Sequence, residues 1–87
     1  MNQRTHELKI QPRFFEPVMR GEKTFEIRKN DRDYKKGDII ILREWSDIMN
    51  NYTGRQLKRK ITYVYKGSGQ FGLAPGYAII ALGFCEE

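Results

Sequence analysis

Residues 21–38 read GEKTFEIRKNDRDYKKGD, and this stretch decides both the fold and the position of the polar residues. Its segment TFEIRK alternates in polarity, with Phe25 and Ile27 on one side and Glu26 and Arg28 on the other. Such alternation is typical of a β-strand with one polar face. The stretch also holds six basic and five acidic side chains. It is therefore either a solvated hairpin edge or the wall of a polar cleft.

Two elements are expected before this strand. HELKI, residues 6–10, alternates in polarity and predicts a short strand. From Pro12 onward, apolar residues recur at helical spacings, which predicts a short helix that ends at Gly21. Because Pro17 has no amide donor, we expect this helix to be irregular or to begin late enough to place Pro17 in its first turn.

The remainder of the chain predicts three more strands. Segment 30–37 is rich in turn residues, and GSGQFGLAPG (67–76) holds four glycines, so we expect both to be loops. Apolar runs separate these loops, and DIIILREW includes four consecutive aliphatic residues, as in a buried strand. We therefore expect a turn at 50–54 and strands at 38–45, 55–66 and 77–84. The strand at 55–66 is long enough to bend.

Length and composition limit the class of protein. Eighty-seven residues with five expected strands and one short helix after the first strand predict a single domain over 1–87 of mixed α/β, mainly β class: a small β-barrel of about five strands. The net charge of +5 favours polyanionic partners such as RNA. One cysteine and one histidine are too few for an internal disulfide or a Cys/His zinc site. The N-terminus has no apolar run like that of a signal peptide, and no segment approaches the roughly 18 apolar residues of a membrane span, so we expect a cytoplasmic protein without membrane contact. We also expect no cofactor.

The motif residues resemble a known family. The resemblance rests on GEKTFEIR, the later Gly37–Asp38 pair, HELKI and PGYAIIALGF. In these segments the chain resembles an ASCH domain (activating signal cointegrator homology), a branch of the PUA-like superfamily. FEIRKNDRDY and LREW resemble small stand-alone bacterial and phage domains of unknown function. The resemblance implies a PUA-like β-barrel that binds RNA or a nucleotide in a cleft walled by Lys23, Glu26 and Arg28.

The same resemblance implies an enzymatic alternative. Some similar domains act on modified nucleosides as amidohydrolases, or on RNA as ribonucleases, and Lys23 and Glu26 would then be the candidate catalytic residues. In the amidohydrolase branch, a threonine stands at the position of Glu26, and a helical insertion that this chain lacks adds a glutamate. A lysine base must also give up its proton readily, whereas neighbouring acids favour the charged form. We therefore expect binding rather than catalysis.

Each motif residue also has a plain structural alternative. Glu26 and Arg28 could form a solvated ion pair, which contributes about 0 to 1 kcal/mol. In a cleft, Arg28 would instead offer its planar guanidinium to a phosphate or a base edge, and Glu26 would accept from an amine or orient Arg28. Lys23 could be a solvated lysine after a helix C-terminus.

Further basic and aromatic residues complete the expected surface. The cations of 32–36 and 55–60 would attract a nucleic-acid backbone if they met on one side, and would otherwise be ordinary charged surface. The aromatics Tyr34, Trp45, Tyr52 and Phe71 are candidates for stacking on bases, and Phe71 lies in the loop expected to border the cleft. The expected nucleic-acid-binding residues are Lys23, Glu26, Arg28, Lys29, Arg32, Lys58, Lys60 and Phe71.

Other chemistries have weaker support. A metal-dependent nuclease could draw oxygen ligands for Mg²⁺ from Glu26, Asp31, Asp33 and Asp38, but acids among lysines in a turn are more often solvated, so we expect no metal site. His6 is distant in sequence from both serines, which disfavours a Ser/His/acid triad. A phage or bacterial protein-interaction module remains the third alternative, and the oligomeric state stays open.

Overall fold

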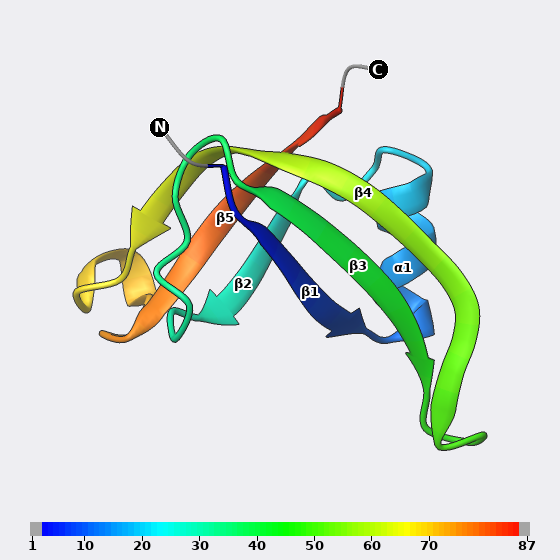
Figure 1. The fold of residues 1–87 in the computed structure, drawn as a ribbon. Helices are drawn as coiled ribbons and strands as arrows, with labels where there is room; N and C mark the ends of the chain where they lie inside the picture. Colours follow the sequence, from blue (N-terminus) through cyan, green and yellow to red (C-terminus); the bar gives the residue numbers. More distant parts are fainter. Residues whose placement is uncertain (1–2, 86–87) are drawn as a thin grey trace.

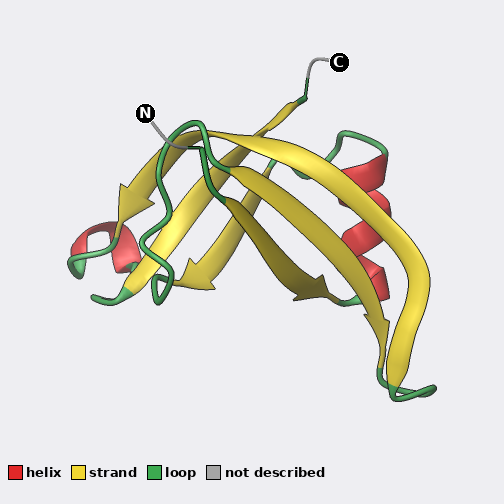
Figure 2. Ribbon diagram, viewed as in Figure 1, coloured by secondary structure: helices red, strands yellow, loops and turns green. Residues whose placement is uncertain are grey.

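The computed structural model describes residues 3–85, which form a mainly β fold with one α-helix after the first strand (Figures 1 and 2). In the described residues, no helix is both long enough and apolar enough to cross a membrane. The elements are β1 (Thr5–Ile10), α1 (Pro12–Met19), β2 (Phe25–Lys29), β3 (Ile39–Ser46), β4 (Asn51–Lys66), the 3₁₀ turn η1 (Gln70–Gly72) and β5 (Tyr77–Phe84).

The five strands form one curled sheet in the order β1-β3-β4-β5-β2. β1 pairs with β3 in parallel, and the other neighbours are antiparallel. Figure 1 shows that the curl brings the two edge strands, β1 and β2, toward each other, so that the sheet forms a half-barrel. The space between these two edges is where the barrel is open.

The core fills the inside of the curl. α1 lies against it through Phe15 and Val18, which are the buried residues of the helix. Tyr34, a candidate for base stacking on sequence grounds, is instead a core residue, with its ring 4.9 Å from that of His6. The stacking expectation for Tyr34 was therefore wrong. The buried cluster consists of Leu8, Ile10, Phe15, Val18, Tyr34, Ile40, Leu42, Ile61, Ile80 and Leu82.

The long strand β4 begins earlier than its sequence predicts. Residues 51–54 of the turn expected at 50–54 lie within the strand, and the connection from β3 is at 47–50. Tyr52 extends the pairing because it lies opposite Trp45, with the two rings 5.0 Å apart in a T-shaped arrangement. Gly54, with φ of 97°, accompanies a register shift that bends the strand. Figure 1 shows β4 arching along the sheet, which confirms the expected bend.

The helix prediction was correct in position, but the alternative in which the helix begins late was wrong. α1 starts at Pro12, and Pro17 lies inside it rather than in its first turn. A proline in that position removes the hydrogen bond to the carbonyl oxygen of Arg13. Because α1 has only two turns and Arg13 is exposed, water can satisfy that carbonyl.

Candidate functional site

In β2 a charged residue faces the core and the apolar residues face solvent, which is the reverse of the usual arrangement in a barrel strand. Glu26 is only 5% exposed, whereas Phe25 and Ile27 are 43% and 55% exposed. The reason is the pairing with β5, in which Glu26 lies opposite the core residue Ile80. The alternative of a solvated ion pair on the barrel wall is therefore wrong, because the carboxylate faces the interior.

Two cations compensate the buried carboxylate. Arg28 donates to Glu26 from Nε at 2.9 Å, and its Nη2 lies 2.8 Å from the same oxygen, Oε2. The Lys23 ammonium donates to the other oxygen, Oε1. A buried carboxylate is tolerated only where paired charges and hydrogen bonds replace water. Lys23, Glu26 and Arg28 therefore form one charged unit, as the cleft hypothesis requires.

Both cations also bind main-chain carbonyl groups. Lys23 Nζ donates to the carbonyl oxygen of Phe25 at 2.8 Å. Arg28 Nη2 donates to that of Lys9 at 2.6 Å and so connects β2 to β1. The Lys23 ammonium lies 4.9 Å from the ring centroid of Phe25 and 5.5 Å from that of Phe14. These contacts fix the position of each charge relative to the two aromatic rings.

A cleft of about 460 Å³ lies beside this charged unit, between the end of β1, the start of α1 and the edge strand β2. Its size is within the range of pockets that hold small ligands. The wall combines cations, one buried carboxylate and two partly exposed aromatic rings. The lining residues are Lys9, Ile10, Gln11, Phe14, Lys23, Phe25, Glu26, Ile27 and Arg28.

The other residues expected to bind nucleic acid lie outside this cleft. Arg32 donates to the carbonyl oxygen of Glu7 at 2.8 Å and makes a second connection to β1. Lys58 lies on β4 opposite Ile41, and Lys29 is exposed at the end of β2. Phe71 belongs to the loop 67–76, which contributes no lining residue although we expected it to border the cleft.

The two basic clusters meet only in part. Lys60 lines a second hollow together with Lys35 and Lys36. Arg55 and Arg59 have internal roles instead, because both donate to groups of α1. Of these cations, the structure therefore brings Lys35, Lys36 and Lys60 together at one hollow.

Sequence reasoning assigned three of the nine cleft residues to the site and missed the other six, which are Lys9, Ile10, Gln11, Phe14, Phe25 and Ile27. Phe14 and Phe15 are adjacent on α1, and of the two only Phe15 is buried in the core. Lys9 lies on the exposed side of β1, where a lysine is common, so its position did not mark it as a binding residue. The parallel pairing of β1 beside β3 brings these residues to the open edge, and no local pattern encodes that pairing.

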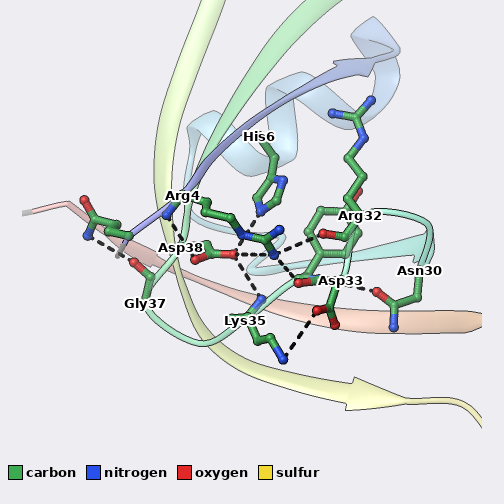
Figure 3. Close-up of polar contacts among 10 residues, drawn as sticks. Arg4, His6, Asn30, Arg32, Asp33, Lys35, Gly37 and Asp38 are labelled. Atoms are coloured by element: carbon green, nitrogen blue, oxygen red, sulfur yellow. Dashed lines mark hydrogen bonds and ion pairs between the residues drawn. The ribbon is translucent and has the colours of Figure 1, made fainter. Parts of the chain in front are cut away.

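Asp38, the motif acid after Gly37, is the centre of a separate polar cluster (Figure 3). Its carboxylate accepts from His6 Nε2 at 2.9 Å and from the main-chain amides of Lys35 and Arg4 at 3.1 and 3.3 Å. Burial raises the pKa of Asp38, but these hydrogen bonds outweigh it and the net pKa is lowered. Asp38 and Glu26 therefore serve different clusters and do not form the shared Mg²⁺ site considered from the sequence.

A third buried carboxylate, Glu44, connects the sheet to the helix. Arg55 donates to it from Nε at 2.9 Å and from Nη2 at 2.8 Å, and Thr53 donates at 2.6 Å. The hydrogen bonds from Arg55 lower the pKa of Glu44 despite its burial. The same Arg55 donates to Glu16 on α1 at 2.7 Å. This network holds α1 at the position from which Phe14 reaches the cleft.

Comparisons with known proteins place this site within a shared domain. A family model described as "Domain of unknown function (DUF3850)" matches residues 5–82, which include every residue lining the cleft. The "Uncharacterized 12.9 kDa protein in GpA 3'region" of Escherichia phage P2 is 41% identical over 64 residues. That alignment covers 74% of this chain and 57% of the phage protein, so the chain spans little more than half the length of this relative.

Proposed function

The chain belongs to the family described as a domain of unknown function (DUF3850), and from this premise we propose that it binds RNA, or a nucleotide-like fragment, in the cleft between β1 and β2. We include in this proposal a PUA-like barrel of the ASCH type. The half-barrel with one helix after the first strand supports that assignment.

One observation carries the proposal: the buried Glu26 carboxylate holds Lys23 and Arg28 at the wall of the cleft. A buried ion pair is weak evidence for stability, because burying its charges is costly and apolar residues of similar volume often serve as well. With Lys9, the cleft wall has three cations and one carboxylate, a local charge of +2. Such a wall attracts anionic ligands.

The aromatic rings supply the second part of nucleotide recognition. Phe14 and Phe25 are both partly exposed, and both line the cleft. Single-stranded RNA is commonly read by stacking unpaired bases on aromatic side chains while cations contact the phosphates. The cleft combines both features within about 460 Å³, which suits a fragment of nucleotide size.

One contact favours an enzyme as the second candidate function. Lys23 and Glu26 touch directly in the cleft and would form the chemical pair of an enzyme acting on a modified nucleoside or on RNA. Lys23 Nζ already donates to the carboxylate and to the carbonyl oxygen of Phe25, contacts that position it as a binding group at the cleft wall. Turnover of acylated cytidine or of RNA that Lys23→Ala abolishes would favour this candidate.

A fluorescence-anisotropy titration tests the binding proposal. Short single-stranded RNA and matching DNA are titrated with the protein at two salt concentrations, using wild type, Lys23→Ala and Arg28→Ala. Loss of a charged hydrogen bond should weaken RNA binding about 10- to 100-fold in either variant. Arg43→Ala, which removes an arginine of β3 outside the cleft, should have less than about a threefold effect. Absence of binding at low salt, or equal losses in all three variants, would overturn the proposal.

A further inference from the structure

The outward face of β2, β5 and β4 carries two rows of apolar and aromatic side chains, which we name the aromatic rows. The register places each residue of β5 between a partner on β2 and a partner on β4. Cross-strand partners project from the same face of a sheet, so each set of three lies side by side. The aromatic rows are Phe25–Ala81–Tyr63 and Ile27–Ile79–Tyr65.

The aromatic rows are open to solvent because the core uses the other face of these strands. Glu26, Ile80 and Val64 alternate with them and point inward. Tyr63 is 63% exposed, and together with Phe25 and Ile27 it forms an apolar surface in the described structure. Clustered exposed apolar side chains of this kind mark interaction sites.

This surface is continuous with the cleft at one end and with the glycine-rich loop at the other. Phe25 and Ile27 belong both to the aromatic rows and to the cleft wall. At the far end, the ring of Phe71 lies 6.3 Å from that of Tyr65. Phe71 is 91% exposed and has φ of 56°, a left-handed conformation that is unfavourable for a bulky residue. The loop therefore holds an aromatic ring in solvent against a local conformational cost.

The charge around the aromatic rows selects the chemistry of the partner. Of the seven basic residues on β2 and β4, Arg28, Arg55 and Arg59 donate to Glu26 or to groups of α1. The other four, Lys29, Lys58, Lys60 and Lys66, are exposed, and the single acidic residue of β2, β4 and β5 is the buried Glu26. A second copy of this chain would bring the same positive charge against this face. A polyanion with exposed bases complements both its charge and its aromatic rings.

We propose that the aromatic rows form a stacking platform for a single-stranded RNA, which leads from the cleft across the sheet to Phe71. This inference rests on the proposed function in one respect, because the cleft would hold one end of the same strand. Successive unpaired bases would stack on Tyr63, Tyr65 and Phe71, and lysines such as Lys29 and Lys60 would contact the phosphates.

Probes of two lengths separate the platform from the cleft. A dinucleotide can fill the cleft alone, whereas a single-stranded RNA of about eight nucleotides can also cover the sheet. Each titration by fluorescence anisotropy uses wild type, Tyr63→Ala, Tyr65→Ala and Lys23→Ala. Tyr63→Phe tests whether the ring is the active part, because it retains the aromatic face. Ile48→Ala, at an exposed apolar residue of the turn 47–50, is the matched surface control.

The platform predicts a length-dependent result. Tyr63→Ala and Tyr65→Ala should weaken binding of the longer RNA about 5- to 100-fold and leave dinucleotide binding unchanged, while Tyr63→Phe and Ile48→Ala should match wild type. Because Tyr63 is exposed, these variants should keep the wild-type circular dichroism spectrum. Equal affinity of wild type and the tyrosine-to-alanine variants for the longer RNA would overturn the platform. So would a dimer seen by sedimentation that Tyr63→Ala dissociates.

The two proposals fail separately. If Lys23→Ala leaves both affinities unchanged while Tyr63→Ala weakens only the longer RNA, the cleft proposal is overturned and the platform is supported. If Lys23→Ala weakens both probes while the tyrosine variants weaken neither, the cleft is supported and the platform is overturned. Absence of binding to either probe at low salt overturns both.

Discussion

Arg28 on β2 donates a hydrogen bond to the main-chain carbonyl oxygen of Lys9 on β1 over 2.6 Å. These two strands are the edges of the curled sheet, and no backbone ladder joins them. Arg32 makes a second connection of the same kind to the carbonyl oxygen of Glu7. Arginine side chains therefore hold the open side of the half-barrel together, and the cleft lies in the gap that they leave. The residues that would bind a ligand also stabilise the fold at this position.

This double role makes Arg28→Lys a non-conservative substitution. A lysine ammonium keeps the charge but has no planar guanidinium to serve Glu26 and the Lys9 carbonyl together. We expect the free energy of unfolding in urea to fall by about 1 to 3 kcal/mol. Arg20→Lys is the control, because Arg20 forms exposed pairs with Glu16 and Glu22 and should change stability by about 0.5 kcal/mol or less. Equal stability of both variants would contradict a structural role for the Arg28 bridge.

Substituting the whole charged unit with apolar residues separates stability from binding. Glu26→Leu alone leaves two partly buried cations without their carboxylate and should cost about 3 kcal/mol. The triple variant Lys23→Met, Glu26→Leu, Arg28→Met removes all three charges, and such swaps are often neutral or stabilising. We expect its free energy of unfolding in urea to exceed that of Glu26→Leu and to lie within about 1 to 3 kcal/mol of wild type, since the bond from Arg28 to the Lys9 carbonyl is also lost, while RNA binding is lost. A triple variant that still binds RNA with wild-type affinity would show that these charges serve another purpose.

The sequence predicts the strands well but not which way their faces point. The apolar runs of β3 and β5 reach the core as expected, because a continuous aliphatic segment presents an apolar residue to the core in either register. In β2, alternation alone would turn Phe25 and Ile27 inward, yet Glu26 is the buried residue. Glu26 can be buried because Lys23 and Arg28 compensate its carboxylate. The alternation of polar and apolar residues does not show that these partners are available.

Long-range pairing also decides which residues share a site. Lys23, Glu26 and Arg28 lie within six positions of one another, so the motif alone indicated that they act together. Lys9 and Phe14 join them only because the sheet curls, which local sequence cannot reveal. Tyr34 was misjudged for a related reason: its turn-rich neighbours suggest a surface loop, but it packs beside His6 inside the barrel.

Acid should unfold the protein partly through Asp38. Because the pKa of Asp38 is lowered in the folded state, its contribution to stability is present above the pKa of an unfolded aspartate, about 3.9, and is lost as the pH falls toward the folded value. Thermal melts from pH 6 to pH 2 should therefore show a smaller drop in melting temperature for Asp38→Asn than for wild type. Asp31→Asn, at an exposed position, should follow the wild-type curve. An identical pH dependence for all three proteins would contradict this assignment.

Gly83 is required by a close contact within the sheet. A Cβ atom at this position would lie 2.7 Å from Cγ2 of Thr62 on β4. Because threonine is branched at Cβ, its methyl group has little freedom to move away. Gly83→Ala should cost about 1 to 3 kcal/mol in urea unfolding. Adding Thr62→Ala should restore more than half of that loss, and failure of this rescue would show that another contact excludes the side chain.

Phe71 should show a trade-off between stability and binding. With φ of 56°, it adopts a conformation that costs a residue with a side chain about 1 to 2 kcal/mol and costs glycine little. Its ring is almost fully exposed, so removing the ring loses little buried apolar surface. We expect Phe71→Gly to raise the free energy of unfolding by about 0.5 to 1 kcal/mol after the greater chain entropy of glycine is counted. Phe71→Ala keeps the strained backbone and should stay within about 0.5 kcal/mol of wild type.

Both variants should weaken binding of the longer RNA, because both lack the ring beside Tyr65. If Phe71→Gly were less stable than Phe71→Ala, the left-handed conformation would not be the source of strain, and its link to an exposed binding residue would fail.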